Sequence, residues 1–173
     1  MKKILILILS ISLILGTLVS CSENAEYKDV TYEKDGIKFT LPNTMKQKTM
    51  EGYDFYFTNQ LASLIFTAVK IDKEMLEKAD LSEGITAAEY VDAIIEKNGM
   101  EKDKMYYKYN EYHDQYNFRY TFVDQSGFEI FEYVIVTGTP DNLWYIEMCC
   151  EQEDSATYLE DFEIWSKSIK TTK

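Results

Sequence analysis

Two segments of this chain carry apolar residues on both faces of a β-strand, and this feature most restricts the fold. The segments are 61–71 (LASLIFTAVKI) and 127–137 (GFEIFEYVIVT), both rich in β-branched and aromatic residues. In the second segment, one face holds Phe128, Ile130, Val134 and Val136, and the other holds Phe131, Tyr133 and Ile135. Because successive side chains point to opposite faces of a sheet, such strands need cover on both sides. We therefore expect a sheet between two layers.

Turn signals divide the rest of the chain into further strands. Asp35–Gly36 separates two β-rich runs, as in a two-residue hairpin, and the second run ends at Pro42. Another strand is expected at 53–58, before the segment 61–71. Four long strands, at 104–112, 115–123, 127–137 and 143–151, are expected to form an antiparallel meander.

The segment 115–123 alternates between aromatic and polar residues. One face holds Tyr116, Phe118, Tyr120 and Phe122, and the other holds Gln115, Asn117, Arg119 and Thr121. This pattern is typical of a half-buried antiparallel strand whose polar face meets water.

Two amphipathic helices are expected, with a short third one at 73–79. At 86–98, Thr86 and Glu89 predict a capping box, and Gly99 predicts a left-handed cap at the C-terminal end. The apolar stripe of this helix is Ala87, Val91, Ile94 and Ile95.

The closing segment 154–170 (DSATYLEDFEIWSKSIK) also has a helical apolar face. That face holds Tyr158, Leu159, Phe162, Trp165 and Ile169. Thr157 and Glu160 predict a second capping box. Two apolar helix faces and a doubly apolar sheet together predict an α+β fold, with an antiparallel sheet flanked by helices on both faces.

The order of these elements resembles the PsbP-like superfamily, which includes the extrinsic photosystem subunit, a Ran-binding nuclear-transport factor and many bacterial lipoproteins. The resemblance is carried by DGIKFTLP (35–42), the strand–helix–meander order and the closing helix FEIWSKSIK (162–170). It covers nearly the whole domain and implies an α/β/α sandwich. It also implies a role in binding proteins, because most members act in this way and share no catalytic residues.

The N-terminus has the features of a secretion signal. After two lysines the chain runs without charge from Ile4 to Val19, which is shorter than the roughly 20 residues of a membrane-spanning helix. Leu18 to Cys21 (LVSC) then resembles the lipobox of bacterial lipoproteins. The resemblance implies that the Cys21 sulfur carries diacylglycerol and that the preceding peptide bond is cut. An uncleaved anchor is the less favoured alternative, because charged residues begin directly after Cys21.

These features predict a signal peptide at 1–20, a lipid-anchored tether at 21–28 and a single domain at 29–173. The mature protein is expected on the extracytoplasmic face of a cell membrane, held by acyl chains such as palmitate. Removal of the two signal-peptide lysines changes the formal charge from −12 to −14. Such an acidic surface disfavours nucleic acid and anionic lipid headgroups as partners.

Cys149 and Cys150 are adjacent, in the segment WYIEMCCEQ (144–152). Strand alternation places Trp144, Ile146, Met148 and Cys150 on one face, and Tyr145, Glu147 and Cys149 on the other. A redox-sensing vicinal pair is one interpretation. Two small buried residues are favoured instead, because neither C-x-x-C spacing nor a helix N-terminus is present to lower the pKa of a thiol.

Tyrosine is abundant, with 14 residues concentrated in MYYKYNEYHDQYNFRY (105–120). A tyrosine has a large apolar ring and a polar tip, so an exposed set can stack on sugar rings or line a protein interface. The alternative is that tyrosine is a good strand former, which we favour for Tyr116 and Tyr120. Tyr106 and Tyr112 share one face of the preceding strand, and we take them as the candidate recognition surface.

No catalytic residue, metal site or cofactor site is expected. The single histidine, His113, excludes a zinc site made of paired histidines, and it is better interpreted as a solvated turn residue. The seven glycines form no phosphate-binding motif, and no calcium-binding loop occurs.

The leading hypothesis is a non-enzymatic, membrane-anchored lipoprotein that binds or stabilises another cell-envelope component, above all a protein. Its membrane contact is the acylated Cys21. The second hypothesis is a small-ligand module that binds glycans or peptides through tyrosine side chains. The third and least favoured is a thiol redox protein that uses Cys149 or Cys150.

Overall fold

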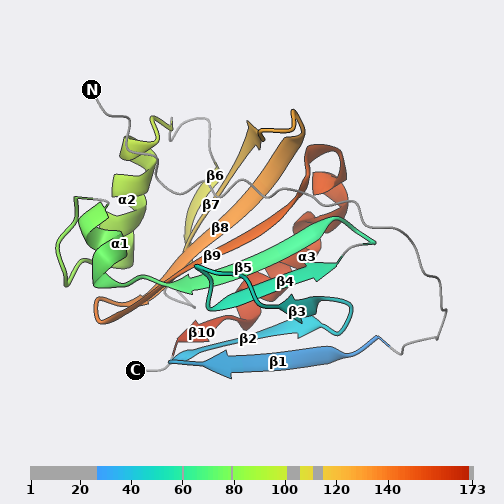
Figure 1. Ribbon diagram of the computed structural model, residues 1–173, viewed down its shortest axis with the longest axis horizontal. Coiled ribbons are helices and arrows are strands. Elements are labelled where there is room, and N and C mark those ends of the chain that lie inside the picture. Colours follow the sequence, from blue (N-terminus) through green and yellow to red (C-terminus); the bar gives the residue numbers. More distant parts are fainter. Residues whose placement is uncertain (1–26, 60, 79, 101–105, 111–114, 172–173) are drawn as a thin grey trace.

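The strands with two apolar faces lie inside a large sheet. The computed structural model describes residues 27–59, 61–78, 80–100, 106–110 and 115–171, and these form a seven-stranded antiparallel sheet in the order β3-β4-β5-β9-β8-β7-β6 (Figure 1). The strands are β3 (Lys46–Lys48), β4 (Phe55–Asn59), β5 (Leu64–Lys70), β6 (Tyr106–Asn110), β7 (Gln115–Val123), β8 (Glu129–Thr139) and β9 (Asn142–Glu151). The meander expected from the sequence is therefore present.

The N-terminal hairpin forms a second, smaller sheet. β1 (Asp29–Lys34) and β2 (Ile37–Pro42) pair with each other, and β10 (Lys170–Thr171) pairs with β2. Asp35 and Gly36 have φ angles of 48° and 87°, which are the two positive values that a type I′ hairpin turn needs. The hairpin was expected, but its separation from the main sheet was not.

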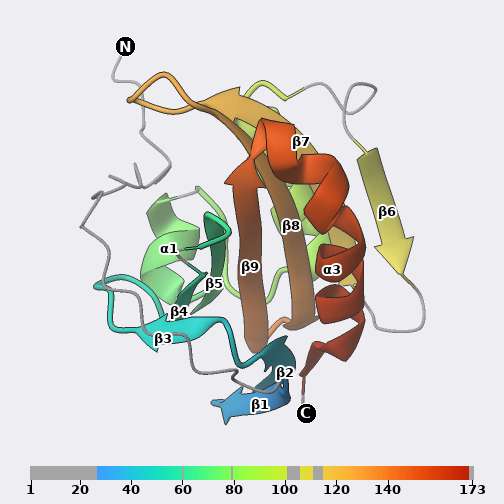
Figure 2. The same cartoon turned by 90° about the vertical axis from the view of Figure 1, so that its right-hand side faces the viewer.

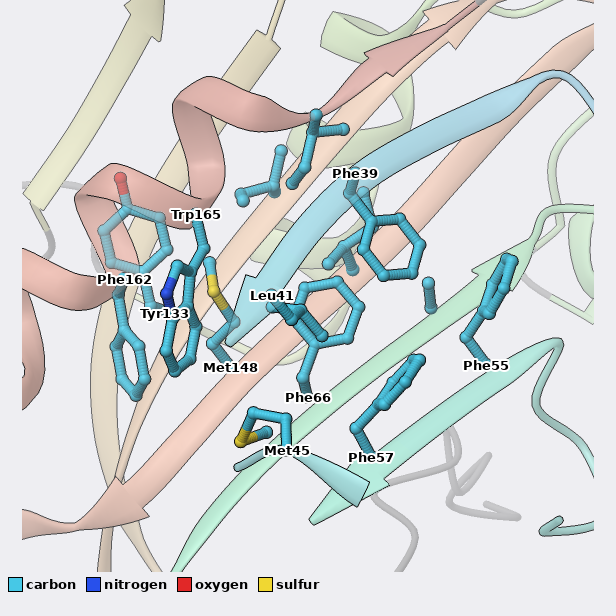
Figure 3. Packing of buried hydrophobic residues seen from close by; sticks show 14 of the residues in the cluster. Phe39, Leu41, Met45, Phe55, Phe57, Phe66, Tyr133, Met148, Phe162 and Trp165 are labelled. Atoms are coloured by element: carbon cyan, nitrogen blue, oxygen red, sulfur yellow. The ribbon is translucent and has the colours of Figure 1, made fainter. Parts of the chain in front are cut away.

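One face of the main sheet is covered by this hairpin and by α3 (Ser155–Ser168). Figure 3 shows Phe162 and Trp165 of α3 beside Tyr133, and the ring centroids of Phe162 and Trp165 are 5.7 Å apart. Phe39 of β2 packs against Phe66 of β5, at a centroid distance of 4.7 Å. The apolar face predicted for the closing helix is confirmed, because Phe162, Trp165 and Ile169 are buried in this aromatic core.

The opposite face is covered by α2 (Ala87–Lys97), which follows the short helix α1 (Lys73–Lys78) (Figures 1 and 2). The predicted capping box is present: the Thr86 amide donates to Glu89 Oε2 at 2.7 Å, and the Glu89 amide donates to Thr86 Oγ1 at 3.3 Å. Gly99 takes the expected left-handed conformation, with a φ of 63°. The apolar stripe of α2 packs on Phe118 of β7 and Val134 of β8.

In the part of the chain that the structure describes, no helix is long and apolar enough to span a bilayer.

The second predicted capping box is wrong. α3 begins at Ser155 with Asp154 as its N-cap residue, and no side chain caps it. A 3₁₀ turn at Gln152–Asp154 runs directly into the helix, so Thr157 lies inside the first helical turn and not before it.

The polar face of β7 was expected in water, but α3 covers it. Gln115 and Asn117 are buried, and Asn117 Nδ2 donates to the Tyr133 hydroxyl at 3.1 Å. Arg119 Nη2 pairs with Glu163 Oε1 of α3 at 2.8 Å. The amide oxygens Gln115 Oε1 and Asn117 Oδ1 are buried without a hydrogen-bond partner, so only the nitrogen of each amide is satisfied. Local alternation does not reveal which polar groups find partners across a sheet.

Gln115 is hydrogen-bonded to the C-terminal end of α3. Its Nε2 donates to the carbonyl oxygens of Ser166 and Ile169, both at 3.1 Å. The last carbonyls of a helix have fewer partners within the helix than the others. The Ser166 carbonyl also accepts from the Ile169 amide at 3.2 Å, and Gln115 adds a buried side-chain donor to both carbonyls.

We expect Gln115→Leu, which keeps the side-chain volume but removes the donor, to lower the free energy of unfolding by about 2 kcal/mol, because two buried carbonyls lose a partner. Urea unfolding measures the change. Gln47→Leu, on the exposed edge strand β3, is the matched control and should change stability by less than about 0.5 kcal/mol. Equal effects of the two substitutions would contradict the role assigned to Gln115.

Candidate functional site

A polar seam crosses the α2-side face of the main sheet. It consists of Tyr56 of β4, Thr67 of β5, Glu147 of β9, Glu132 of β8 and Tyr120 of β7. Tyr56 lies opposite Thr67, which lies opposite Glu147. Glu132 lies opposite Tyr120 and is the diagonal neighbour of Glu147, because Glu147 pairs with Val134, two positions further along β8. The register of four strand pairs thus brings these side chains into one line.

Glu132 and Glu147, here called the carboxyl pair, are the unusual members of the polar seam. The strand register sets them side by side, with Tyr120 opposite Glu132. Thr67 Oγ1 donates to Glu147 Oε2 at 3.1 Å. Only 6% of the Glu132 surface is exposed. Burial and then the neighbouring Glu147 hold the pKa of Glu132 well above its usual range, against an opposing effect of the Tyr120 hydrogen bond.

Several tyrosines surround the carboxyl pair. Burial and then the charge of Glu147 raise the pKa of Tyr90 to about 12, and the same two causes raise the pKa values of Tyr53 and Tyr145. Burial and then Glu132 raise the pKa of Tyr120. The phenol groups therefore stay protonated at neutral pH and are suited to donate hydrogen bonds to carboxyl oxygens.

The two cysteines face opposite sides of β9, which confirms the prediction from alternation. Cys149 packs with Tyr56 and Ile65 on the α2 side, whereas Cys150 belongs to the aromatic core under α3. Both are free thiols, with 6% and 2% of their surfaces exposed.

The surroundings of both thiols favour the protonated form at neutral pH. Burial, then Glu132 and Glu147, raise the pKa of Cys149 well above its usual range. Burial, then Asp154 and Glu151, raise the pKa of Cys150 to about 12. Because the thiolate is the nucleophile, these environments favour a packing role for both residues.

We expect both thiols of the native protein at pH 7 to react with iodoacetamide at least about a hundredfold more slowly than in urea, because each must wait for the structure to open. Mass spectrometry of the peptide that contains both residues measures the two rates. Rapid alkylation of either thiol in the native protein would instead support the hypothesis of a thiol redox protein.

The structure describes only one of the three site residues predicted from the sequence. Cys21 and Tyr112 lie outside the described residues, so their assigned roles stay predictions. Tyr106 is the first residue of β6, and its backbone pairs with Arg119 of β7. Nearby on β6, Tyr109 is 43% exposed, and its ring packs on Tyr116 at a centroid distance of 4.7 Å.

The carboxyl pair was not predicted from the sequence, although one residue in it indicated an unusual site. Glu132 is the one charged residue in the apolar run IFEYVIV (130–136) of a strand expected to be covered twice. A charged side chain in such a strand must be paired or neutralised. Among the described residues, no group of three or more His, Cys, Asp and Glu side chains is arranged to hold a metal ion.

The comparisons with known proteins concern the fold. No protein-family model and no curated protein matches the chain. The solved structure of cyanobacterial PsbP (CyanoP) from Synechocystis sp. PCC 6803 is 16% identical, covers 91% of this chain and 100% of its own, and has a TM-score of 0.55. The chain has a PsbP-like fold.

Two other solved structures are less similar. The Ran-binding protein Mog1p of Saccharomyces cerevisiae has a TM-score of 0.46 and 10% identity, over 84% of this chain and 95% of its own. LpqN of Mycobacterium tuberculosis, described as involved in cell envelope biogenesis, has a TM-score of 0.46 and 7% identity, over 86% of this chain and 92% of its own. We base the PsbP-like assignment on the cyanobacterial structure alone.

Proposed function

We propose that this protein is a lipoprotein, held by Cys21 at the extracytoplasmic face of a cell membrane, whose PsbP-like domain binds another envelope component without catalysis. The observation that carries the proposal is the LVSC stretch directly after an uncharged segment. Acyl chains on Cys21 contribute about 0.8 kcal/mol of membrane affinity for each buried methylene, so two or more chains hold the protein stably.

The tether keeps the domain close to the bilayer. β1 begins at Asp29, and residues 22–28 span at most roughly 25 Å when fully extended. A domain on so short a tether meets partners in the membrane or in the layer next to it. The formal charge of −14 that remains after signal removal disfavours anionic lipid headgroups, so a protein partner is favoured.

The proposed non-catalytic role is supported by the protonation state of the buried reactive groups. Cys149, Cys150 and Glu132 are buried, and their raised pKa values favour the neutral forms. Neutral thiols are poor nucleophiles. The resemblance of the sequence to the PsbP-like superfamily, whose members mostly bind proteins, supports the same conclusion.

In-cell crosslinking with mass spectrometry tests this proposal. Wild-type protein is expected in the membrane fraction, with a lipid-shifted Cys21 peptide and a discrete crosslinked protein, because acylation holds the domain beside its partner. Cys21→Ala should lose all three, whereas the adjacent control Ser22→Ala should keep them.

Two results would count against the proposal in different ways. An unmodified Cys21 peptide from wild-type membranes would contradict the lipid anchor. An anchored wild-type protein without any discrete crosslinked partner would contradict protein binding.

A second candidate function, the binding of small ligands through tyrosine rings, is favoured by Tyr109. Its ring is partly exposed and is supported from behind by Tyr116. Supported aromatic rings of this kind stack on sugar rings or on the side chains of a peptide. Tyr109 lies opposite Tyr116 in the β6–β7 pair, so this face of β6 is the place where such a ligand is expected.

Glycan and peptide arrays probed with the full-length protein test this alternative. Tyr109→Ala should weaken binding about tenfold, because it removes a ring contact of about 1.4 kcal/mol. Tyr27→Ala is the matched control, since Tyr27 is exposed but lies before β1. If Tyr109→Ala binds as tightly as the wild type and the control do, tyrosine recognition at β6 is wrong.

A further inference from the structure

Three exposed apolar side chains lie at turns on one end of the main sheet, here called the apolar end. Leu61, in the connection between β4 and β5, is 98% exposed. Val123 at the end of β7 is 66% exposed, and Phe128 just before β8 is 51% exposed. Exposed apolar residues that gather in one place are typical of a surface that meets a partner or a membrane.

The strand register brings these turns to the same end of the sheet. β5 begins where β9 ends, since Ile65 lies opposite Cys149. β9 ends where β8 begins, and β8 begins where β7 ends, since Glu129 lies opposite Val123. Three described turns lie at the opposite end and hold no exposed large apolar side chain: 35–36, 70–72 and 139–142.

The chain enters the domain at the apolar end. Lys28 directly precedes β1, and it is bonded to Asn43, which directly follows β2: the Asn43 amide donates to the Lys28 carbonyl at 2.7 Å. A short turn then leads to Lys46 at the start of β3, which lies opposite Thr58 near the end of β4. Figure 1 shows the starts of β1 and β5 on the same side of the molecule. A tether at 21–28 therefore leaves the domain beside the exposed turns.

The turn between β7 and β8 is held in a fixed geometry by its own hydrogen bonds. Asp124 Oδ1 accepts from the amides of Ser126 and Phe128, at 2.8 and 2.9 Å. The Asp124 amide donates to the Phe128 carbonyl at 2.8 Å. An ordered turn loses less conformational entropy on contact with a surface than a flexible loop does, so this turn is suited to docking.

The charges at the apolar end are of both signs. Asp124 and Glu129 flank the turn between β7 and β8, whereas Lys46 and Lys48 are exposed on β3. Such a mixture gives little net attraction to anionic headgroups. Contact with a bilayer must then come from the apolar side chains, which reach roughly 5–10 Å into the boundary between headgroups and acyl chains.

We propose that the apolar end rests on the membrane that anchors this chain, with Leu61, Val123 and Phe128 inserted among the lipids. This inference rests on the proposed anchorage, because a tether of at most roughly 25 Å keeps this end beside the bilayer. Insertion removes the exposed apolar surface from water, which favours the contact. The opposite end of the sheet then faces away from the membrane, toward the envelope partner.

Photolabelling in native membranes tests this docking. Membranes from cells that express the full-length chain receive a phosphatidylcholine whose acyl chain carries a diazirine, and residue-level mass spectrometry locates the label. The turns that hold Leu61 and Phe128 should carry at least about tenfold more label than the turn 139–142, because the reagent stays in the lipid. Equal labelling of the two ends, or no label at the apolar end, would overturn the docking.

The mass of the Cys21 peptide in the same sample separates this inference from the lipid anchor. A lipid-shifted Cys21 peptide without label at the apolar end would contradict the docking alone. Label at the apolar end with an unmodified Cys21 peptide would support the docking and contradict the acylation.

A double variant tests the side chains themselves. Leu61→Ser combined with Phe128→Ser should reduce the label at Val123 about tenfold, because two of the three inserted side chains are lost. Ile164→Ser is the matched control, since Ile164 is 54% exposed but lies on α3. The control should change the label less than about twofold, as is usual for surface substitutions. Equal effects of the double variant and the control would contradict insertion of these turns.

Discussion

The need to cover β8 and β9 on both faces organises the whole molecule. Trp144, Ile146 and Met148 of β9 point into the aromatic core under α3 and the β1–β2 hairpin, while Val134 and Val136 of β8 point under α2. The chain places a helix and a separate hairpin on one face, and a helix with its flanking segments on the other (Figures 1 and 2). Burying apolar area on both faces stabilises a sheet that is otherwise held by its backbone ladder.

The two faces differ in chemistry, and that difference locates the features of interest. The α3 side is mainly aromatic and aliphatic, and beneath α3 the Gln115 side-chain nitrogen donates to two carbonyls at the end of that helix. The α2 side changes from an apolar patch beneath α2 to the polar seam beside it. A buried acid in the middle of a sheet costs stability unless it is neutralised or paired. Burial raises the pKa of Glu132 and favours its neutral form, and Thr67 donates a hydrogen bond to Glu147.

Much of the local structure is already evident in the sequence, because it depends on neighbours along the chain. Alternation placed Cys149 and Cys150 on opposite faces, Thr86 and Glu89 marked the start of α2, and the Asp35–Gly36 turn marked the hairpin. Only the tertiary structure decided which residues face one another on neighbouring strands and between layers. It moved the hairpin off the main sheet, covered Gln115 with α3, and brought Glu132 beside Glu147 through the register of β8 and β9. Period and capping are set within a few residues, whereas strand order and register depend on how distant apolar surfaces pack together.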